Sequence, residues 1–393
     1  MGSMKLLIIG GTGLLSSAVL SEALANGIEV TVVNRGLKKS SVPDGVACIK
    51  ADYRNEELMR SKLAGLHFDA VIDFICFNKP QIEYSINLLH GISDQYVFIS
   101  TTCVYNTHIS GVKKEDSEKV LKEWYYSVDK WDCECYLQEQ SQKLSFNYTI
   151  IRPCVTYDDT RIPYGIMPHY GYHWTLCARI LAGKPIIRWD EGTAKWNMMR
   201  VEDFAVGVVG LIGKKTAYNE AFNLSGDEAY EWNDVINVLS SYLGKDLVFF
   251  DISSEEYAKI YPDRKGEIVG RSLDAIVSNE KIKTVVPSYK SVYSLEEGLI
   301  KTLDAYKAQN YQKGIDWCFD AETDRIICDY CKSHGIDKNK YYLKFVDYLG
   351  SASRSDKRDY YLTFHKENIL IKTYYQAKTI YSRVLRRIKR VVS

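Results

Sequence analysis

Short apolar runs alternate with stretches of helical spacing along the N-terminal part of the chain. We expect strands in the ranges 4–11, 28–34, 46–52, 68–76 and 95–101, and helices in the ranges 14–27, 55–65 and 79–92. The apolar residues of these strands are continuous rather than alternating, which indicates burial on both faces. Repeated strand–helix–strand order then predicts an α/β fold with a doubly wound parallel sheet of the Rossmann type.

The composition of the sequence changes at about residue 158. The irregular aromatic stretch "YGIMPHYGYHW" begins shortly after this position. Helical and strand-like segments follow it, and beyond about residue 310 the chain becomes rich in tyrosine and charge. We predict a Rossmann domain at 4–157, a smaller α/β substrate lobe at 158–308 that is partly interleaved with it, and a helical, basic C-terminal extension at 309–393.

Composition narrows the class of protein. The chain has 393 residues, of which 46% are hydrophobic, and a formal net charge of +1, so a large core is expected and nucleic acid is not expected as a partner. The N-terminus lacks the pattern of a signal peptide, and the ten cysteines form no framework. We therefore expect reduced thiols and a cytoplasmic location.

One cysteine pair, Cys328 and Cys331, has the spacing of metal ligands, with Cys318 before it and His334 after it. A structural zinc site usually needs a second closely spaced pair, which the sequence lacks. We expect these residues to pack on one face of a helix and predict no metal site.

A glycine-rich turn joins the first expected strand to the first expected helix. In "IIGGTGLLSS", Gly10, Gly13 and Ser16 follow the spacing G-x-x-G-x-x-S. Glycine permits a tight turn and a close approach to a pyrophosphate, and the helix N-terminus supplies N–H groups. The turn therefore predicts a dinucleotide site. Asp52 and Tyr53, after the third strand, are candidates for adenine contacts, although Asp52 is equally well explained as a helix cap or a loop acid.

A second pattern carries catalytic chemistry. Thr101 ends an expected strand, and Tyr126 and Lys130 follow in "YYSVDKW", four residues apart and so on one helix face. We expect the ammonium to lower the pKa of the phenol, which can then exchange a proton during hydride transfer while Thr101 holds the substrate oxygen. The pattern Y-x-x-x-K alone is common in proteins. Its combination with the glycine turn and the strand-end hydroxyl makes the catalytic interpretation specific.

Together these stretches resemble the extended short-chain dehydrogenase/reductase family of nucleotide-sugar epimerases, dehydratases and reductases, and in particular an atypical epimerase-like branch. The resemblance runs from residue 4 to about 305 through "GGTGLLS", "FISTTCVY", "YYSVDK", "YTIIRPCVTY", "MMRVEDFA" and "AFNLSGDEAYEW". It implies that Thr101, Tyr126 and Lys130 are the catalytic residues. It also implies cofactor contacts from Gly10, Thr12, Gly13, Leu14, Leu15, Asn34, Arg35, Asp52, Tyr53, Ile75, Lys130 and Pro153.

Some positions depart from the family pattern. The acid pair of the 4,6-dehydratases is replaced by Thr102 and Cys103, which argues against water elimination. The usual phosphate-binding arginine is Trp196, so Lys195 or Arg200 is expected to replace it. Thr102 is kept as a further candidate for substrate binding.

The corner after the second strand is unusual. A carboxylate there binds the ribose diol of NAD, whereas this chain has Asn34 and Arg35. Arginine pairs well with a phosphate, so NADP(H) is favoured, with NAD(H) as the alternative cofactor. The other explanation is that Arg35 is a solvated turn residue.

Two more segments have alternative explanations. His173 and Trp174 in the aromatic stretch either stack on a nucleotide base or pack between the lobes. The C-terminal "KTIYSRVLRRIKRVVS" predicts a basic amphipathic helix, which could contact an anionic membrane surface. Packing on protein is favoured there, and a homodimer is expected.

The resulting function hypothesis is an NAD(P)H-dependent oxidoreductase that reduces a nucleotide-linked keto sugar, for example a CDP-ketose to a CDP-alditol, for polysaccharide precursor synthesis. The alternatives are a nucleotide-sugar epimerase with tightly bound NAD and a non-catalytic binding module.

Overall fold

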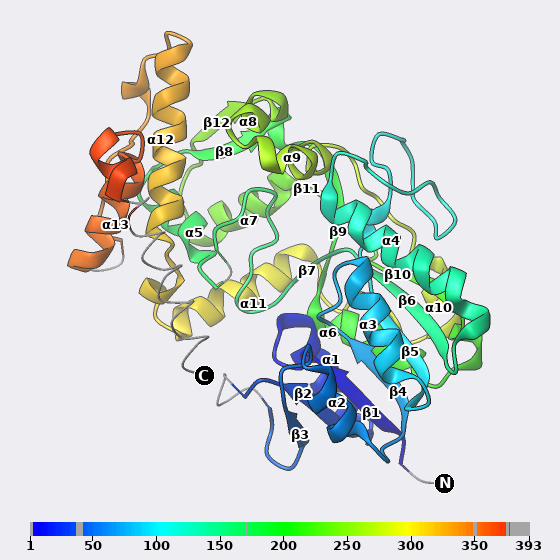
Figure 1. Cartoon of the computed structure of the whole chain (residues 1–393). Helices are drawn as coiled ribbons and strands as arrows, with labels where there is room; N and C mark the ends of the chain where they lie inside the picture. The colour runs from blue at the N-terminus through cyan, green and yellow to red at the C-terminus, as the bar shows by residue number, and fades with distance from the viewer. Residues whose placement is uncertain (1–2, 37–41, 170, 349–351, 375–376, 378–393) are drawn as a thin grey trace.

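The computed structural model describes residues 3–36, 42–169, 171–348, 352–374 and 377 (Figure 1). Its largest element is a parallel seven-stranded sheet in the order β10-β6-β5-β4-β1-β2-β3. The strands are β1 (Lys5–Ile9), β2 (Glu29–Asn34), β3 (Ala47–Lys50), β4 (Phe68–Asp73), β5 (Ser93–Ile99), β6 (Asn147–Pro153) and β10 (Glu220–Leu224). This is the doubly wound sheet that the apolar runs predict, which confirms the expected fold class.

Helices cover both faces of the large sheet. One face packs against α1 (Leu14–Ala25), α6 (Val201–Leu211) and α10 (Glu280–Val285), and the other packs against α2 (Glu56–Leu63), α3 (Lys79–Leu89) and α4 (Tyr125–Gln140). Two separate apolar cores result, one on each face. Asn55 and Asn78 cap the starts of α2 and α3 with their side chains, which satisfies amide groups that a helix leaves free.

The second lobe contains two small sheets. One has the order β11-β9-β7, and the other pairs β12 with β8. Its strands are β7 (Val155–Tyr157), β8 (Ile186–Trp189), β9 (Lys195–Arg200), β11 (Ala229–Glu231) and β12 (Phe249–Ile252), and its helices are α5 (Trp174–Leu181), α7 (Trp232–Leu243), α8 (Ser254–Ile260), α9 (Lys265–Arg271) and α11 (Leu295–Ala308). The strand β10 and the helix α6 come from the same stretch of sequence but join the large sheet, so the two parts are interleaved.

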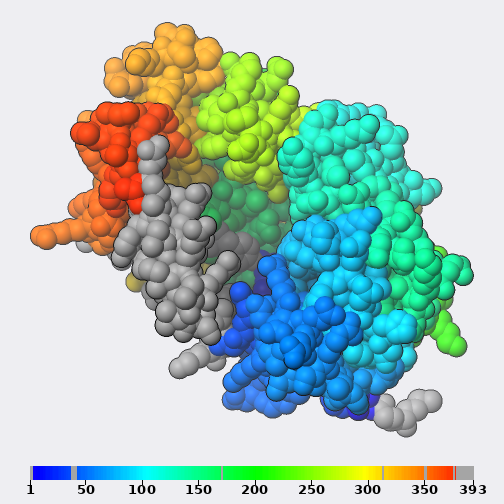
Figure 2. Space-filling model, in the orientation of Figure 1, coloured from blue at the N-terminus to red at the C-terminus, as the bar shows by residue number. Residues whose placement is uncertain are grey.

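The C-terminal extension contains α12 (Trp317–Ser333) and α13 (Arg354–Phe364). In Figures 1 and 2 these helices, coloured orange to red, lie against the second lobe and away from the large sheet. Ile326 and Ile327 of α12 belong to the same apolar core as α5 and α7. The extension therefore shares a core with the second lobe.

No helix within the described ranges is long and apolar enough to cross a membrane. The basic amphipathic helix predicted for "KTIYSRVLRRIKRVVS" lies outside the described residues.

Candidate functional site

The glycine turn leaves β1 and enters α1 in a conformation that only glycine adopts easily. Gly10 has a φ of +84°, and a Cβ added to it would lie 2.5 Å from Ile75 Cγ2. Gly13 begins α1, and its N–H donates to Ser16 Oγ at 2.8 Å. Ser16 Oγ in turn donates to the Gly10 carbonyl at 2.8 Å. The serine at the third glycine position therefore braces the turn from inside.

This turn has the shape that a dinucleotide pyrophosphate needs. The first N–H groups of a helix have no acceptor within the helix, and at α1 they belong to Leu14 and Leu15. The positive end of the α1 dipole adds to the attraction for an anion. Thr12 lies at the apex, where its N–H donates to the Gly10 carbonyl at 2.9 Å. Ile75, in the segment after β4, packs against Gly10.

The corner after β2 presents an amide and an exposed guanidinium. Asn34 Oδ1 accepts a hydrogen bond from the Gly36 N–H at 2.8 Å, which turns the chain. Arg35 is exposed. With no carboxylate at either position, the corner lacks the group that binds a ribose diol and repels a phosphate.

The two adenine candidates lie in different environments. Asp52 is exposed, and its carboxylate accepts from the Arg54 N–H at 3.1 Å, a local hydrogen bond within the loop. The Tyr53 side chain is only 5% exposed and its hydroxyl donates to Ser85 Oγ at 3.2 Å. The ring of Tyr53 therefore belongs to the core beneath α3, which is a correction to the expectation that it contacts adenine.

Three predicted catalytic residues meet at the carboxyl end of β5. Lys130, on α4, donates from Nζ to the carbonyl oxygens of Ile99 and Cys76, each at 2.7 Å. Tyr126 lies one turn earlier on α4 and its hydroxyl hydrogen-bonds to the Thr101 side chain. Pro153, the last residue of β6, is buried on the neighbouring strand.

The protonation of Tyr126 differs from the expectation. Burial raises the pKa of the phenol above its usual value of about 10, against the lowering effect of the Thr101 hydrogen bond. Burial thus outweighs the lowering that was expected from Lys130, whose ammonium group two backbone carbonyls hold. Burial also lowers the pKa of Lys130 itself. Tyr126 is therefore protonated at neutral pH, as an unperturbed tyrosine also is.

A buried ion pair fixes the catalytic helix to the sheet. Glu134, on the same face of α4 as Tyr126 and Lys130, pairs with Arg152 of β6 at 2.6 Å, and their side chains are 0% and 2% exposed. Glu134 also accepts from Ser100 Oγ at 2.5 Å. Sequence reasoning missed Glu134, although its position four residues after Lys130 was a usable signal.

Two arginines of the second lobe contribute positive charge beside Tyr126. Arg161, in the segment after β7, and Arg271, at the end of α9, both act electrostatically on the Tyr126 hydroxyl. The Arg271 guanidinium lies 5.8 Å from the Trp124 ring, which is 6.2 Å from the ring of Tyr126. Nε and Nη1 of Arg271 are buried without a hydrogen-bond partner among the described residues, although Nε lies 3.2 Å from Glu267. Neither arginine has a sequence signal that separates it from other surface arginines.

The other predicted substrate residues divide by exposure. Lys195 is exposed on β9 and Thr102 is buried beside Thr101. Arg200 is 1% exposed and binds Asp159 at 2.6 Å, Glu202 at 3.0 Å and the Gly298 carbonyl at 2.9 Å. Arg200 therefore ties α11 to the end of β9 and to the segment after β7, which corrects the expectation that it replaces a phosphate-binding arginine.

The aromatic pair His173 and Trp174 is buried, with each residue 1% exposed. Ile162 donates to His173 Nδ1 at 3.0 Å, and Trp174 stacks on Tyr311 with ring centroids 4.0 Å apart. Of the two explanations given for this pair, packing inside the protein is the one that the structure supports, and stacking on a base is not.

The residues around the Cys328 and Cys331 pair are spread over different environments. Cys331 is buried, Cys328 is half-buried and Cys318 is exposed. His334 stacks on Tyr330 at 3.9 Å. Within the described part of the chain, no three side chains of His, Cys, Asp or Glu form a group that could hold a metal ion.

Comparison with known proteins decides the family. The model of the NAD dependent epimerase/dehydratase family matches residues 6–225, which is more than half of the chain. The chain belongs to this family. The match includes the glycine turn, the predicted catalytic residues and β10, and confirms the resemblance inferred from the sequence motifs.

Individual relatives are distant. The chain is 20% identical to 2'-dehydrokanamycin reductase from Streptomyces kanamyceticus, over 73% of this chain and 80% of the relative. It is 25% identical to the chloroplast stem-loop binding protein of 41 kDa b from Arabidopsis thaliana, over 75% and 77%. UDP-glucuronic acid 4-epimerase from Bacillus cereus, solved with UDP-glucuronic acid and NAD, has a TM-score of 0.62 at 19% identity, covering 78% of this chain and all of the other. The similarity to that structure establishes the fold.

Removing one member of the buried ion pair should destabilise the protein strongly. In Glu134→Ala, Arg152 remains as an unpaired buried charge, and we expect the free energy of unfolding to fall by roughly 3–5 kcal/mol. Urea denaturation measures this change. Glu139→Ala, an exposed position on the same helix, is the control and should change little. A loss below about 1 kcal/mol in Glu134→Ala would show that the pair is not a structural anchor.

The buried histidine should make the protein sensitive to acid. Burial lowers the pKa of His173 from 6.5 to about 4, so the folded state resists a proton that the unfolded state accepts. The resulting stability is fully present above pH 6.5 and is lost as pH falls toward 4. We expect the stability advantage of wild type over His173→Asn, whose side chain can still accept from Ile162, to shrink by roughly 3 kcal/mol across this window.

Unfolding free energies measured from pH 7 to pH 4 provide the test. His90→Asn removes an exposed histidine and serves as the control. A constant difference between wild type and His173→Asn across the pH range would contradict the prediction.

Proposed function

We propose that this chain reduces a nucleotide-linked keto sugar with NADPH as the preferred hydride donor, for example a CDP-ketose to a CDP-alditol. The observation that carries the proposal is the convergence of Thr101, Tyr126 and Lys130 at the carboxyl end of β5, beside the glycine turn. The carboxyl end of a parallel sheet is where such folds bind their ligands.

Each residue has a role in this proposal. The nicotinamide cofactor supplies the hydride when it is bound. The Tyr126 hydroxyl donates a proton to the substrate oxygen, and the Thr101 hydroxyl holds that oxygen by a hydrogen bond. The Lys130 ammonium lies at the strand end, where it can bind the ribose of the cofactor. Gly10, Gly13 and the start of α1 hold the pyrophosphate.

Two electrostatic features support reduction of a nucleotide-linked substrate. Tyr126 is protonated at neutral pH and can supply the proton that a net reduction needs, whereas an epimerase must also remove a proton. Arg161 and Arg271 place positive charge beside Tyr126, which suits a substrate that carries phosphate. The name of the Streptomyces relative, a reductase, points in the same direction.

Two alternatives have observations in their favour. An epimerase is favoured by the structural similarity to a UDP-glucuronic acid 4-epimerase. A binding module without catalysis is favoured by the name of the Arabidopsis relative, a stem-loop binding protein. The presence of threonine, tyrosine and lysine at one strand end argues against a module that performs no chemistry.

Removing the phenol oxygen should abolish turnover. Tyr126→Phe lacks the proton donor, so we expect kcat to fall by about 10²- to 10⁴-fold. The assay is the loss of NADPH absorbance with a panel of keto-sugar nucleotides. Tyr125→Phe is a matched control, because Tyr125 is the preceding residue of α4 and is 77% exposed. If no keto-sugar nucleotide supports NADPH oxidation by the wild type, the proposed reaction is wrong.

Arg35 should determine the choice of cofactor. In Arg35→Ala we expect the Kd for NADPH to rise by about 10- to 100-fold, the value of a hydrogen bond to a charged group, and the Kd for NADH to change little. Fluorescence titration of both cofactors measures this. Arg60→Ala, an exposed arginine that pairs with Glu56 on α2, is the control. An equal rise in Kd for NADPH and NADH would show that Arg35 does not bind the 2′-phosphate.

A further inference from the structure

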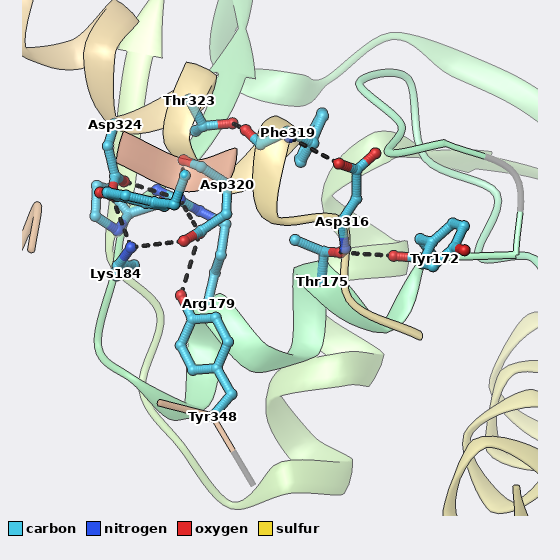
Figure 3. Close-up of polar contacts among 12 residues, drawn as sticks. Tyr172, Thr175, Arg179, Lys184, Asp316, Phe319, Asp320, Thr323, Asp324 and Tyr348 are labelled. Carbon is cyan, nitrogen blue, oxygen red and sulfur yellow. Dashed lines mark hydrogen bonds and ion pairs between the residues drawn. The ribbon is translucent and has the colours of Figure 1, made fainter. Parts of the chain in front are cut away.

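The C-terminal extension holds the segment that follows β7. Asp316, which begins α12, uses both carboxylate oxygens: Oδ1 accepts from the Phe319 N–H at 2.9 Å and Oδ2 accepts from the His169 N–H at 3.1 Å. Its own N–H donates to Thr175 Oγ1 at 2.7 Å. Figure 3 shows Asp316 between Phe319 and Thr175. One residue therefore caps a helix of the extension and anchors two points of the 158–175 segment.

Thr175 connects Asp316 to Tyr172. Its hydroxyl donates to the Tyr172 carbonyl at 2.6 Å, a bond that Figure 3 draws beside the one from Asp316. Tyr311 of the extension stacks on Trp174 with an angle of 12° between the ring planes. A Cβ added to Gly314 would lie 2.7 Å from Trp174 Cβ, so the extension approaches this segment at backbone distance.

A buried charge cluster fixes the extension in this position. Arg179 and Lys184 of the second lobe pair with Asp320 and Asp324 of α12 at 2.6–2.9 Å, and all four side chains are at most 1% exposed. Two cations meet two anions, so the cluster is neutral. The Tyr348 hydroxyl donates to Asp320 at 3.1 Å, as Figure 3 shows. Because an unpaired buried charge is costly, α12 cannot leave α5 without exposing the whole cluster to water.

The other end of the held segment reaches the candidate site. Cys103, which follows the two threonines after β5, packs against the apolar core that contains Ile162 of this segment. Arg161, the residue before Ile162, acts electrostatically on Tyr126 and on Cys103. Thr160 and His173 are both bound to the hydroxyl of Tyr306, at 2.7 Å and 3.1 Å. Tyr306 of α11 thus holds the segment near both ends, and the extension holds it at His169 and Thr175. Arg161 directly follows the anchored Thr160.

We propose that the C-terminal extension is part of the substrate site, and that Asp316 is a positioning residue that fixes residues 158–169 and 171–175 and thereby the place of Arg161 beside Tyr126. The consequence for substrate rests on the proposed function, since it assumes that a phosphorylated substrate lies between Arg161 and Tyr126. The start of the segment, residue 158, and Asp316 are 158 positions apart in the sequence.

The test compares three variants of the full chain. Asp316→Ala removes both anchoring oxygens, and Asp316→Asn keeps one acceptor oxygen, so its effect should be intermediate. Asp337→Ala is the control, because Asp337 caps another turn of the extension by accepting from the Asn339 N–H at 3.0 Å. Hydrogen exchange is measured by mass spectrometry without substrate, followed by NADPH binding and, with UDP-glucose and UDP-glucuronic acid as probes, nucleotide-sugar binding.

We expect faster exchange in residues 167–175 of Asp316→Ala, unchanged exchange in the glycine turn and in α4, and unchanged NADPH binding. Nucleotide-sugar binding should weaken by about tenfold, because a small displacement of a positioned group is costly. Unchanged exchange in 167–175 would overturn the proposal, as would faster exchange with unchanged nucleotide-sugar binding.

If the wild type binds neither nucleotide-sugar, the substrate class of the proposed function is wrong. The exchange measurement still decides whether Asp316 fixes the segment, so the two failures are distinguishable. Uniformly faster exchange across α12 and the second lobe would mean that Asp316 only stabilises the fold, and would also overturn a positioning role.

Discussion

The ion pair between Glu134 and Arg152 is the interaction on which the candidate site depends. It joins the catalytic helix α4 to β6 inside the protein, where neither side chain is more than 2% exposed. Glu134 also binds Ser100, so one carboxylate connects the helix to the ends of two neighbouring strands. Thr101 follows Ser100, Pro153 follows Arg152, and Lys130 precedes Glu134 by one turn. The relative positions of these three residues follow from this pair.

Burial at the same place determines the chemistry. The backbone carbonyls of Cys76, after β4, and of Ile99, at the end of β5, hold the Lys130 ammonium. The pKa of Tyr126 is raised as a result of burial. In the proposed reaction, Tyr126 delivers a proton to a carbonyl compound whose phosphate lies near Arg161 and Arg271. The second lobe and the extension contribute to this arrangement through the segment that carries Arg161.

Local patterns predicted much of the fold and part of the site. A continuous apolar run and a glycine-rich turn are both visible within a few consecutive residues. The parallel sheet and the Gly10 turn could therefore be inferred directly from the sequence. The spacing of Tyr126 and Lys130 fixed their common face because a helix repeats every 3.6 residues. The place of β10 could not be predicted, since an apolar strand does not specify which sheet it joins.

Long-range pairing explains the remaining differences. Arg200 reads as a free cation in sequence, yet it is buried among Asp159, Glu202 and the carbonyl of Gly298. Asp320 and Asp324 are buried, and their partners Arg179 and Lys184 lie more than 130 positions earlier. Sequence spacing carries no information about such contacts. Sequence also could not show that His173, Trp174 and Tyr53 are buried. Aromatic side chains pack in a protein core as readily as they stack on a ligand.

The most direct test of the central claim is the fate of a deuterium atom carried at C4 of NADPH. The wild-type protein is incubated with labelled NADPH and a keto-sugar nucleotide, and the sugar product is analysed by mass spectrometry. We expect one deuterium on the carbon of the former carbonyl group, in a product that carries two more hydrogen atoms than the keto-sugar nucleotide. An unlabelled epimer formed without consumption of NADPH would contradict this expectation.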